Sequence, residues 1–180
     1  DAAKLVGAIE CGPNQDDWEA VDVGMVRLLD RLQSQADGTA ASDFISTGLR
    51  SLDDRLDGGM RPGELIVIGA RPSMGKSALG LTIAANVATQ NRTVGFFSME
   101  MPRDQVVARL VSLTSHIHLS KLKRADRLSD FDWTALSNSS EILRRMPIRI
   151  SDASGLTITQ LRARARALRR RNPDLALLVV

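Results

Sequence analysis

The sequence predicts an α/β fold in which helices flank a central, mostly parallel sheet, and a helical arm precedes this fold in the chain. Apolar, strand-like segments alternate along the chain with segments whose apolar residues recur at helical spacing. The run at residues 175–180 is apolar without alternation, as expected of a strand buried on both faces of a parallel sheet. With 43% hydrophobic residues in 180, the chain can bury one sizeable core.

The arm is predicted from residues 18–33. Apolar side chains recur there at spacings of four, three and four, which marks one face of an amphipathic helix: Val21, Met25, Leu28 and Leu32. The small, polar residues 34–43 then predict a flexible linker and a domain boundary. We therefore expect a linker region at 1–43 and a main domain at 44–180. The arm helix packs either on its own domain or on a neighbouring subunit.

The main domain is predicted to alternate between strands and helices. Strands are expected at residues 64–69, 93–98, 147–151 and 175–180. Helices are expected at residues 49–56 and 76–89, from Pro102 through Leu110, from Ser129 through Leu143, and at 157–171. Ser129 is a predicted helix cap, and Thr157 with Gln160 matches the capping box.

Composition argues against several classes of protein. Cys11 is the single cysteine, so the chain has no internal disulfide, and only His116 and His118 could join it at a metal. We interpret "HIHL", residues 116–119, as a turn between helices. No run approaches the roughly 20 apolar residues of a membrane helix, so we expect a cytoplasmic protein with no membrane partner. Because the chain begins with Asp1 rather than Met, we expect a piece of a longer protein.

The octapeptide ARPSMGKS, residues 70–77, lies between a predicted strand and a predicted helix. Unpaired amides and the helix dipole make a helix start favourable for phosphate, provided that the loop is slim. Gly75 permits close approach, Lys76 can reach the β- and γ-phosphates, and the Ser77 hydroxyl can coordinate Mg²⁺. We predict a site for ATP or another nucleoside triphosphate, formed by Ala70, Arg71, Pro72, Ser73, Met74, Gly75, Lys76, Ser77 and Ala78.

Two further side chains are candidates for this site. Glu100 lies just beyond the apolar segment 94–97 of the predicted strand, at the sheet edge where ligands of α/β folds bind, and is a candidate general base toward water. Arg109, nine residues later, can balance phosphate charge. A solvated glutamate and an exposed salt-bridge partner remain the alternatives. The acidic residue that holds Mg²⁺ in P-loop ATPases is expected after the last strand, beyond Val180.

Six arginines occupy the predicted helix 157–171, while Ile158, Leu161, Ala165 and Leu168 form its predicted buried stripe. The arginines could follow a phosphodiester backbone, although a solvated helix face is the more common meaning of such a run. Aromatic residues are 3% of the chain, so a platform that stacks bases is not indicated. The net charge of +3 is compatible with nucleic acid without requiring it.

Several segments together resemble a known family. Residues 46–77, STGLRSLDDRLDGGMRPGELIVIGARPSMGKS, resemble the start of the ATPase core of RecA-superfamily proteins. The segments ARPSMGKS, FFSMEMP and SDASGLTITQLRARARAL resemble the C-terminal motor domain of DnaB-type replicative DNA helicases, in the same order. The resemblance runs from Ile45 to Val180. It implies a RecA-like P-loop NTPase core.

The resemblance implies a homo-hexameric ring in the bacterial cytoplasm that uses ATP, or another NTP, with Mg²⁺. Such a ring moves 5′ to 3′ on single-stranded DNA, unwinds the replication fork, and works with a primase and a helicase loader. Lys76 and Ser77 match the residues that bind phosphate and Mg²⁺, Glu100 the glutamate that activates water, and Arg109 the arginine that approaches the nucleotide. Residues 18–33 resemble the family's linker helix, which packs on the adjacent subunit.

Parts of the family pattern are expected outside these 180 residues. The acidic Mg²⁺ residue, the DNA-binding loops and the intersubunit arginine finger lie farther along in such helicases. DNA contact is therefore expected mainly through regions beyond residue 180. Two alternatives to a helicase motor stay open: a RecA- or RadA-like recombinase ATPase, and a nucleotide-gated ring-assembly module without unwinding activity.

Overall fold

The computed structural model describes residues 19–37 and 44–180, and the chain forms two compact units, residues 1–43 and 44–180. In the first unit, α2 spans Val21–Ala36. The predicted arm helix is thus confirmed, with both ends shifted toward the C-terminus by three residues. Trp18, Cys11 and most of the predicted linker lie outside the described residues. The apolar face of α2 is exposed within its unit.

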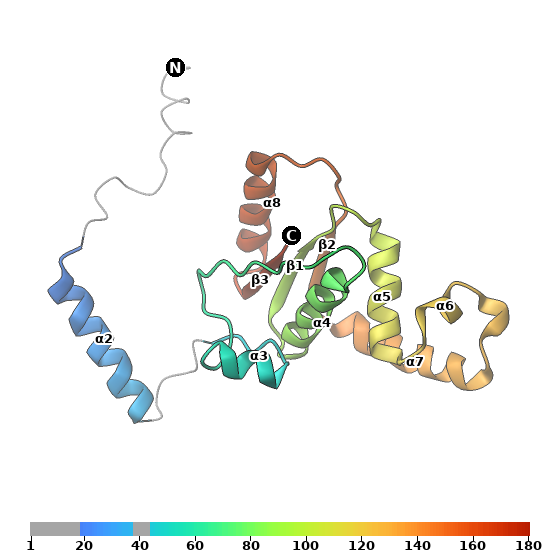
Figure 1. Cartoon of the computed structure of the whole chain (residues 1–180), viewed down its shortest axis with the longest axis horizontal. Helices are drawn as coiled ribbons and strands as arrows, with labels where there is room; N and C mark the ends of the chain where they lie inside the picture. The colour runs from blue at the N-terminus through green and yellow to red at the C-terminus, as the bar shows by residue number, and fades with distance from the viewer. Residues whose placement is uncertain (1–18, 38–43) are drawn as a thin grey trace, which may run out of the picture. The chain divides into compact units, whose positions relative to one another are not determined.

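The second unit is built on a parallel sheet (Figure 1). Its strands are β1 (Thr93–Phe97), β2 (Ile148–Ser151) and β3 (Leu175–Val179), and their order is β2-β1-β3. Both pairings are parallel, with Phe96 opposite Ile150 on one side and Val179 on the other. A parallel sheet flanked by helices confirms the predicted fold class.

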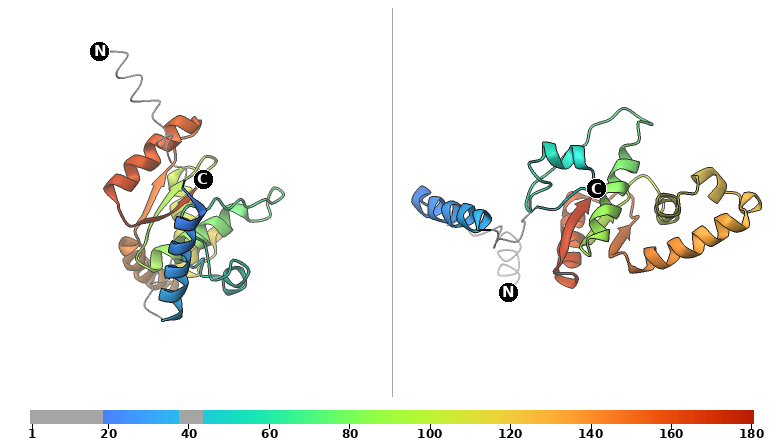
Figure 2. Two further views of the ribbon diagram at one scale, coloured as in Figure 1. Left: turned by 90° about the vertical axis from the view of Figure 1, so that its left-hand side faces the viewer. Right: turned by 90° about the horizontal axis from the view of Figure 1, so that it is seen from below.

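Helices cover both faces of this sheet. α4 (Lys76–Thr89) and α5 (Arg103–Ser115) lie on one face, and α8 (Ile158–Arg171) lies on the other (Figure 2). The main core forms on the α4 side, where Val87, Val94 and Val106 are completely buried. Small residues of α4 allow close approach to the sheet, since a Cβ on Gly80 would lie 3.5 Å from Val179 Cγ1.

The remaining helices are short or peripheral: α3 (Arg50–Arg55), α6 (Leu119–Leu122), the 3₁₀ helix η1 (Ala125–Arg127) and α7 (Asp130–Arg145). α7 packs against α5. Asp53 of α3 accepts hydrogen bonds from the Ser46 hydroxyl at 2.7 Å and from the Thr47 amide at 2.8 Å. Burial would raise the pKa of this carboxyl, but these hydrogen bonds outweigh it and lower the pKa.

Local start signals predicted two helices correctly. Ser129 Oγ accepts the Asp132 amide and Thr157 Oγ1 accepts the Gln160 amide, and in both cases the later side chain bonds back to the amide of the cap residue. The turn predicted at residues 116–119 is also confirmed, since His116 ends α5 with a φ of 57° and His118 caps α6.

Three expectations about burial and pairing are wrong. Residues 64–69 form no strand, and Leu65 and Val67 are 89% and 81% exposed, because no strand of the described chain pairs with this segment. β3 is expected to be buried on both faces but is only half-buried, because it forms one edge of the sheet. Ile158 is 77% exposed rather than part of the buried stripe, because it lies in the first turn of α8. None of the described helices combines the length and apolar character needed to cross a bilayer.

Asp132 gives α7 a pH-dependent start. Its carboxylate accepts hydrogen bonds from Lys121 Nζ at 2.8 Å and from the amide and hydroxyl of Ser129, both at 2.9 Å. The Lys121 bond and the two Ser129 bonds lower the pKa of Asp132 from 3.8 to about 2. A carboxyl whose pKa is depressed by folding stabilises the native state above its unfolded pKa, and loses that effect as the pH falls.

We therefore predict that the α6–α7 region loses protection against amide hydrogen exchange between about pH 4 and pH 2, the interval that the pKa of Asp132 defines. Asp132→Asn should remove most of this dependence. Asp130→Asn is the matched control, because Asp130 is an exposed carboxylate in the same helical turn. An unchanged pH profile in Asp132→Asn would contradict the assignment.

Candidate nucleotide site

The start of α4 lies at the carboxyl edge of the sheet. Only residues 90–92 separate α4 from β1, so the helix must run antiparallel to the strand. Fourteen helical residues span about 21 Å and five strand residues about 17 Å, so the two elements match in length. Lys76 therefore lies at the edge where β1 ends, which is where ligands bind in open α/β sheets.

The backbone of residues 73–75 has the conformation of a tight loop. Ser73 has a φ of 65° and Gly75 a φ of 89°, both in the left-handed region. Gly75 is the N-cap of α4, and its carbonyl accepts the Leu79 amide at 2.9 Å. Since only glycine adopts this conformation without strain, the loop can turn sharply into the helix at this point.

The first turn of α4 has amides available for an anion. No side chain caps the helix, and the amides of residues 76–78 have no intrahelical partner because they belong to the first turn. The loop is exposed from residue 70 to 76, and Ser77 is half-buried. One amide predicted to face the phosphates is already used, because Met74 N–H donates to the Arg71 carbonyl at 3.2 Å.

Glu100 lies in the bend that follows β1. Ser98 is buried, and its hydroxyl donates to the Met101 carbonyl at 2.6 Å, which closes the bend and leaves Glu100 exposed. Glu100 thus follows β1 at the edge of the sheet where Lys76 begins α4. Arg109 is half-buried on α5, six residues or about 9 Å from the start of that helix. Its guanidinium makes no hydrogen bond or ion pair with the described residues.

An ion pair that the sequence analysis did not identify holds this bend. Asp152 follows β2 and accepts hydrogen bonds from the Arg103 amide at 3.1 Å and from Arg103 Nη2 at 2.9 Å. The hydrogen bond from the Arg103 amide lowers the pKa of Asp152, and the charge of Arg103 adds to this effect. The pair ties the start of α5 to the end of β2. The signal in the sequence was the polar run SDAS after an apolar strand.

The described residues offer few protein ligands for a metal. In residues 19–37 and 44–180, no group of three His, Cys, Asp or Glu side chains could hold an ion. The half-buried Ser77 hydroxyl is the predicted ligand in the first turn of α4. This donor set suits Mg²⁺, which is commonly held by few protein oxygens together with substrate phosphates and water.

Comparison with known proteins agrees with this geometry. A family model for the DnaB-like helicase C terminal domain matches residues 44–180. The chain belongs to this family. Replicative DNA helicase DnaB of Pasteurella multocida (strain Pm70) is 34% identical to it over 158 residues, which are 86% of this chain and 34% of that protein. The DnaB of Buchnera aphidicola subsp. Baizongia pistaciae (strain Bp) is 38% identical over 138 residues, 76% of this chain and 29% of that protein.

Two solved structures share the fold. One, described as an ATPase domain, has a TM-score of 0.77 at 28% identity, over 91% of this chain and 56% of that one. The other, a DnaB-like replicative helicase described with its interactions with primase, has a TM-score of 0.75 at 26% identity, over 99% of this chain and 42% of that one. The chain therefore spans about a third of the curated DnaB relatives and about half of these structures.

We predict that Gly75→Ala weakens nucleotide binding by up to about thirtyfold. A left-handed conformation costs a non-glycine residue about 1–2 kcal/mol, which the free loop escapes by leaving the conformation that binds phosphate. No atom lies within 4 Å of a Cβ built on Gly75, so the effect is one of backbone strain. Gly69→Ala is the matched control, because its Cβ also has open space and its φ is not positive. Titration with a fluorescent ATP analogue measures both. Equal affinities would contradict the prediction.

Proposed function

We propose that this chain is the ATP-dependent motor region of a ring-forming replicative DNA helicase. The observation that carries the proposal is the uncapped start of α4, which includes the last two residues of ARPSMGKS and lies at the carboxyl edge of a parallel sheet. Membership of the DnaB-like C-terminal family supports it. The cycle couples nucleotide hydrolysis to 5′ to 3′ movement on single-stranded DNA. The recombinase alternative is not favoured, because the relatives are named as helicases.

In this proposal, residues 70–78 bind the phosphates and each polar side chain has a separate role. Lys76 balances the charge of the β- and γ-phosphates, and the Ser77 hydroxyl would hold Mg²⁺, which would neutralise phosphate charge. Glu100 orients and deprotonates the attacking water, and Arg109 approaches the nucleotide from α5. The Arg103–Asp152 pair positions Glu100 by fixing the bend that carries it.

We infer further that residues 1–43 form a linker region and 44–180 the ATPase domain. The apolar face of α2 includes Met25, Leu28 and Leu32, each more than half exposed, and this supports its packing on an adjacent subunit of a homo-hexamer. Single-stranded DNA is held mainly by regions beyond residue 180. A primase is a proposed partner, since one of the similar structures is described with primase. We propose a helicase loader as a further partner, and a cytoplasmic, replisomal location.

Glu100→Gln should keep nucleotide affinity within about twofold and lower ATP turnover by about 10²-fold to 10⁴-fold, the usual contribution of a general base. The amide keeps the size of the side chain but cannot accept the proton. Glu141→Gln is the control, because Glu141 is an exposed glutamate on α7 paired with Arg145. Binding lost in proportion to turnover would remove Glu100 from the role of base.

Strand displacement tests the proposed activity itself. A protein extended to the length of its curated relatives should unwind a forked DNA in the presence of ATP and Mg²⁺. Lys76→Ala should reduce unwinding and ATP turnover more than tenfold, because charged hydrogen bonds to phosphate are lost. ATP turnover without unwinding, in a protein that forms rings, would instead favour the ring-assembly module.

A further inference from the structure

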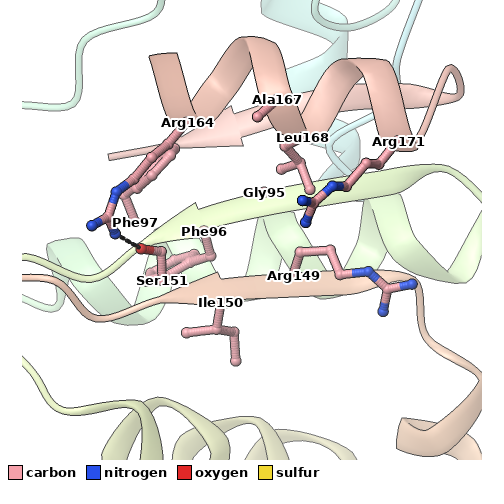
Figure 3. Close-up of a pocket in the computed structure, with 10 residues that line it drawn as sticks. All are labelled: Gly95, Phe96, Phe97, Arg149, Ile150, Ser151, Arg164, Ala167, Leu168 and Arg171. Atoms are coloured by element: carbon pink, nitrogen blue, oxygen red, sulfur yellow. Dashed lines mark hydrogen bonds between the residues drawn. The ribbon is translucent and has the colours of Figure 1, made fainter. Parts of the chain in front are cut away.

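A groove runs between α8 and the strands β1 and β2, on the face of the sheet opposite α4 (Figure 3). Its volume is about 310 Å³, and Gly95, Phe97, Ala167 and Leu168 contribute to its apolar surface. Gly95 determines how α8 is seated, because a Cβ there would come within 2.6 Å of Leu178 Cδ2 and 2.7 Å of Leu168 Cδ2. The helix therefore packs closely over β1 and β3, and the side of β2 stays open.

Two arginines of α8 mark the ends of this groove. Arg164 and Arg171 are seven residues apart, so they lie on one face of the helix about 10 Å from each other. Figure 3 shows both side chains reaching from α8 toward the strands, and Arg164 Nη1 donates to Ser151 Oγ at 3.2 Å. A third arginine, Arg149 of β2, also lines the groove.

Arg164 and Arg171 have no carboxylate partner among the described residues. Arg149 differs, because a hydrogen bond from Thr93 lowers the pKa of Asp174 and the Arg149 charge adds to this effect. α8 contains no acidic residue, and no ion pair within the described ranges involves Arg149, Arg164 or Arg171. Most of the surface between them is apolar. An occupant that complements this groove therefore carries negative charges at the positions of the guanidinium groups.

The edge of β2 next to the groove is unpaired in the described chain. The Pro147 carbonyl, just before β2, accepts the Val94 amide at 2.9 Å, and the Ser151 carbonyl accepts the amide of Ser98, just after β1, at 2.7 Å. The odd-numbered residues of β2 therefore face β1. Backbone groups alternate in direction along a strand, so Ile148 and Ile150 present theirs to the open edge. The Ile148 amide is bonded to the Met146 carbonyl at 2.8 Å, which leaves the Ile150 amide as the outward donor.

We propose that an extended, acidic segment of a partner protein adds to the open edge of β2 and places its carboxylates against Arg164 and Arg171. Strand addition supplies backbone hydrogen bonds, while the side chains that alternate to one face supply specificity. Side chains on the α8 face of the added strand meet arginines. Those on the opposite face lie beside Ile150, which is half-buried. The matching segment therefore alternates acidic and apolar residues.

An acidic, extended peptide matches both the arginines of the groove and the unpaired edge of β2. A polynucleotide could meet the arginines through its phosphates and accept the Ile150 amide, but it lacks the alternating donors and acceptors that pair with both the amide and the carbonyls of a strand edge. Phe96 and Phe97 are the aromatic residues of the groove, and each is 5% exposed, too little to stack on a base. The inference does not depend on the proposed helicase activity, because it uses the α8 face of the sheet and not the start of α4.

The test uses the 180-residue chain and a fluorescein-labelled peptide of three Glu-Val repeats. Arg164→Gln and Arg171→Gln should each weaken binding about tenfold, the loss expected for one charge-assisted contact. Arg169→Gln removes the same charge from the far face of α8 and should change the affinity less than twofold. Hydrogen exchange should show new protection of the Ile150 amide on binding, with no change at Arg149, whose backbone faces β1.

Equal effects of Arg169→Gln and Arg171→Gln, or no added protection at the Ile150 amide, would overturn the proposal. Equal affinity for a peptide of three Gln-Val repeats would also overturn it. So would displacement of the peptide by a twelve-residue oligodeoxythymidylate whose own binding is weakened by Arg164→Gln and Arg171→Gln. The last result would assign the groove to nucleic acid. Arg164→Gln also removes the hydrogen bond to Ser151 and can lower the melting temperature. In that case the peptide affinity of Arg171→Gln is the deciding measurement, since Arg171 makes no hydrogen bond with the described residues.

Discussion

The three-residue connection between α4 and β1, residues 90–92, is the constraint on which the rest of the structure depends. It forces the helix to return antiparallel to the strand, so that the loop before α4 reaches the edge where β1 ends. The equally short connection at residues 172–174 does the same for α8 and β3. Because the strands are parallel, the phosphate loop, the bend with Glu100 and the residue Asp152 gather at one edge of the sheet.

Close packing of helices on the sheet makes these short connections possible. α4 presents Gly80, Ala84 and Ala88 to the strands, and each is buried. On the opposite face, Gly95 lets Leu168 of α8 approach the backbone of β1. The same close approach leaves the β2 side of that face uncovered. The end of β2 links the two regions, because Ser151 bonds to Arg164 in the groove and the next residue, Asp152, holds the bend that carries Glu100.

The sequence predicted elements whose signals are local. The capping boxes at Ser129 and Thr157 act within four residues, so both helix starts were found, and helical spacing gave the bounds of α4. Pairing is not local. The apolar segment 64–69 has the composition of a strand, but a strand needs a neighbour, and none of the described strands lies beside it. The Arg103–Asp152 pair, 49 residues apart, and the turn of Arg164 toward the sheet depend likewise on tertiary contacts.

The central feature of the proposed site is the first turn of α4, whose backbone amides bind phosphate. Amide chemical shifts of the isotope-labelled chain, recorded before and after addition of a non-hydrolysable ATP analogue with Mg²⁺, test this directly. If these amides bind phosphate, the largest changes fall on Gly75, Lys76, Ser77 and Ala78, followed by the bend at residues 98–101. Saturating nucleotide that leaves these amides unchanged, or that shifts only residues lining the α8 groove, would contradict phosphate binding there.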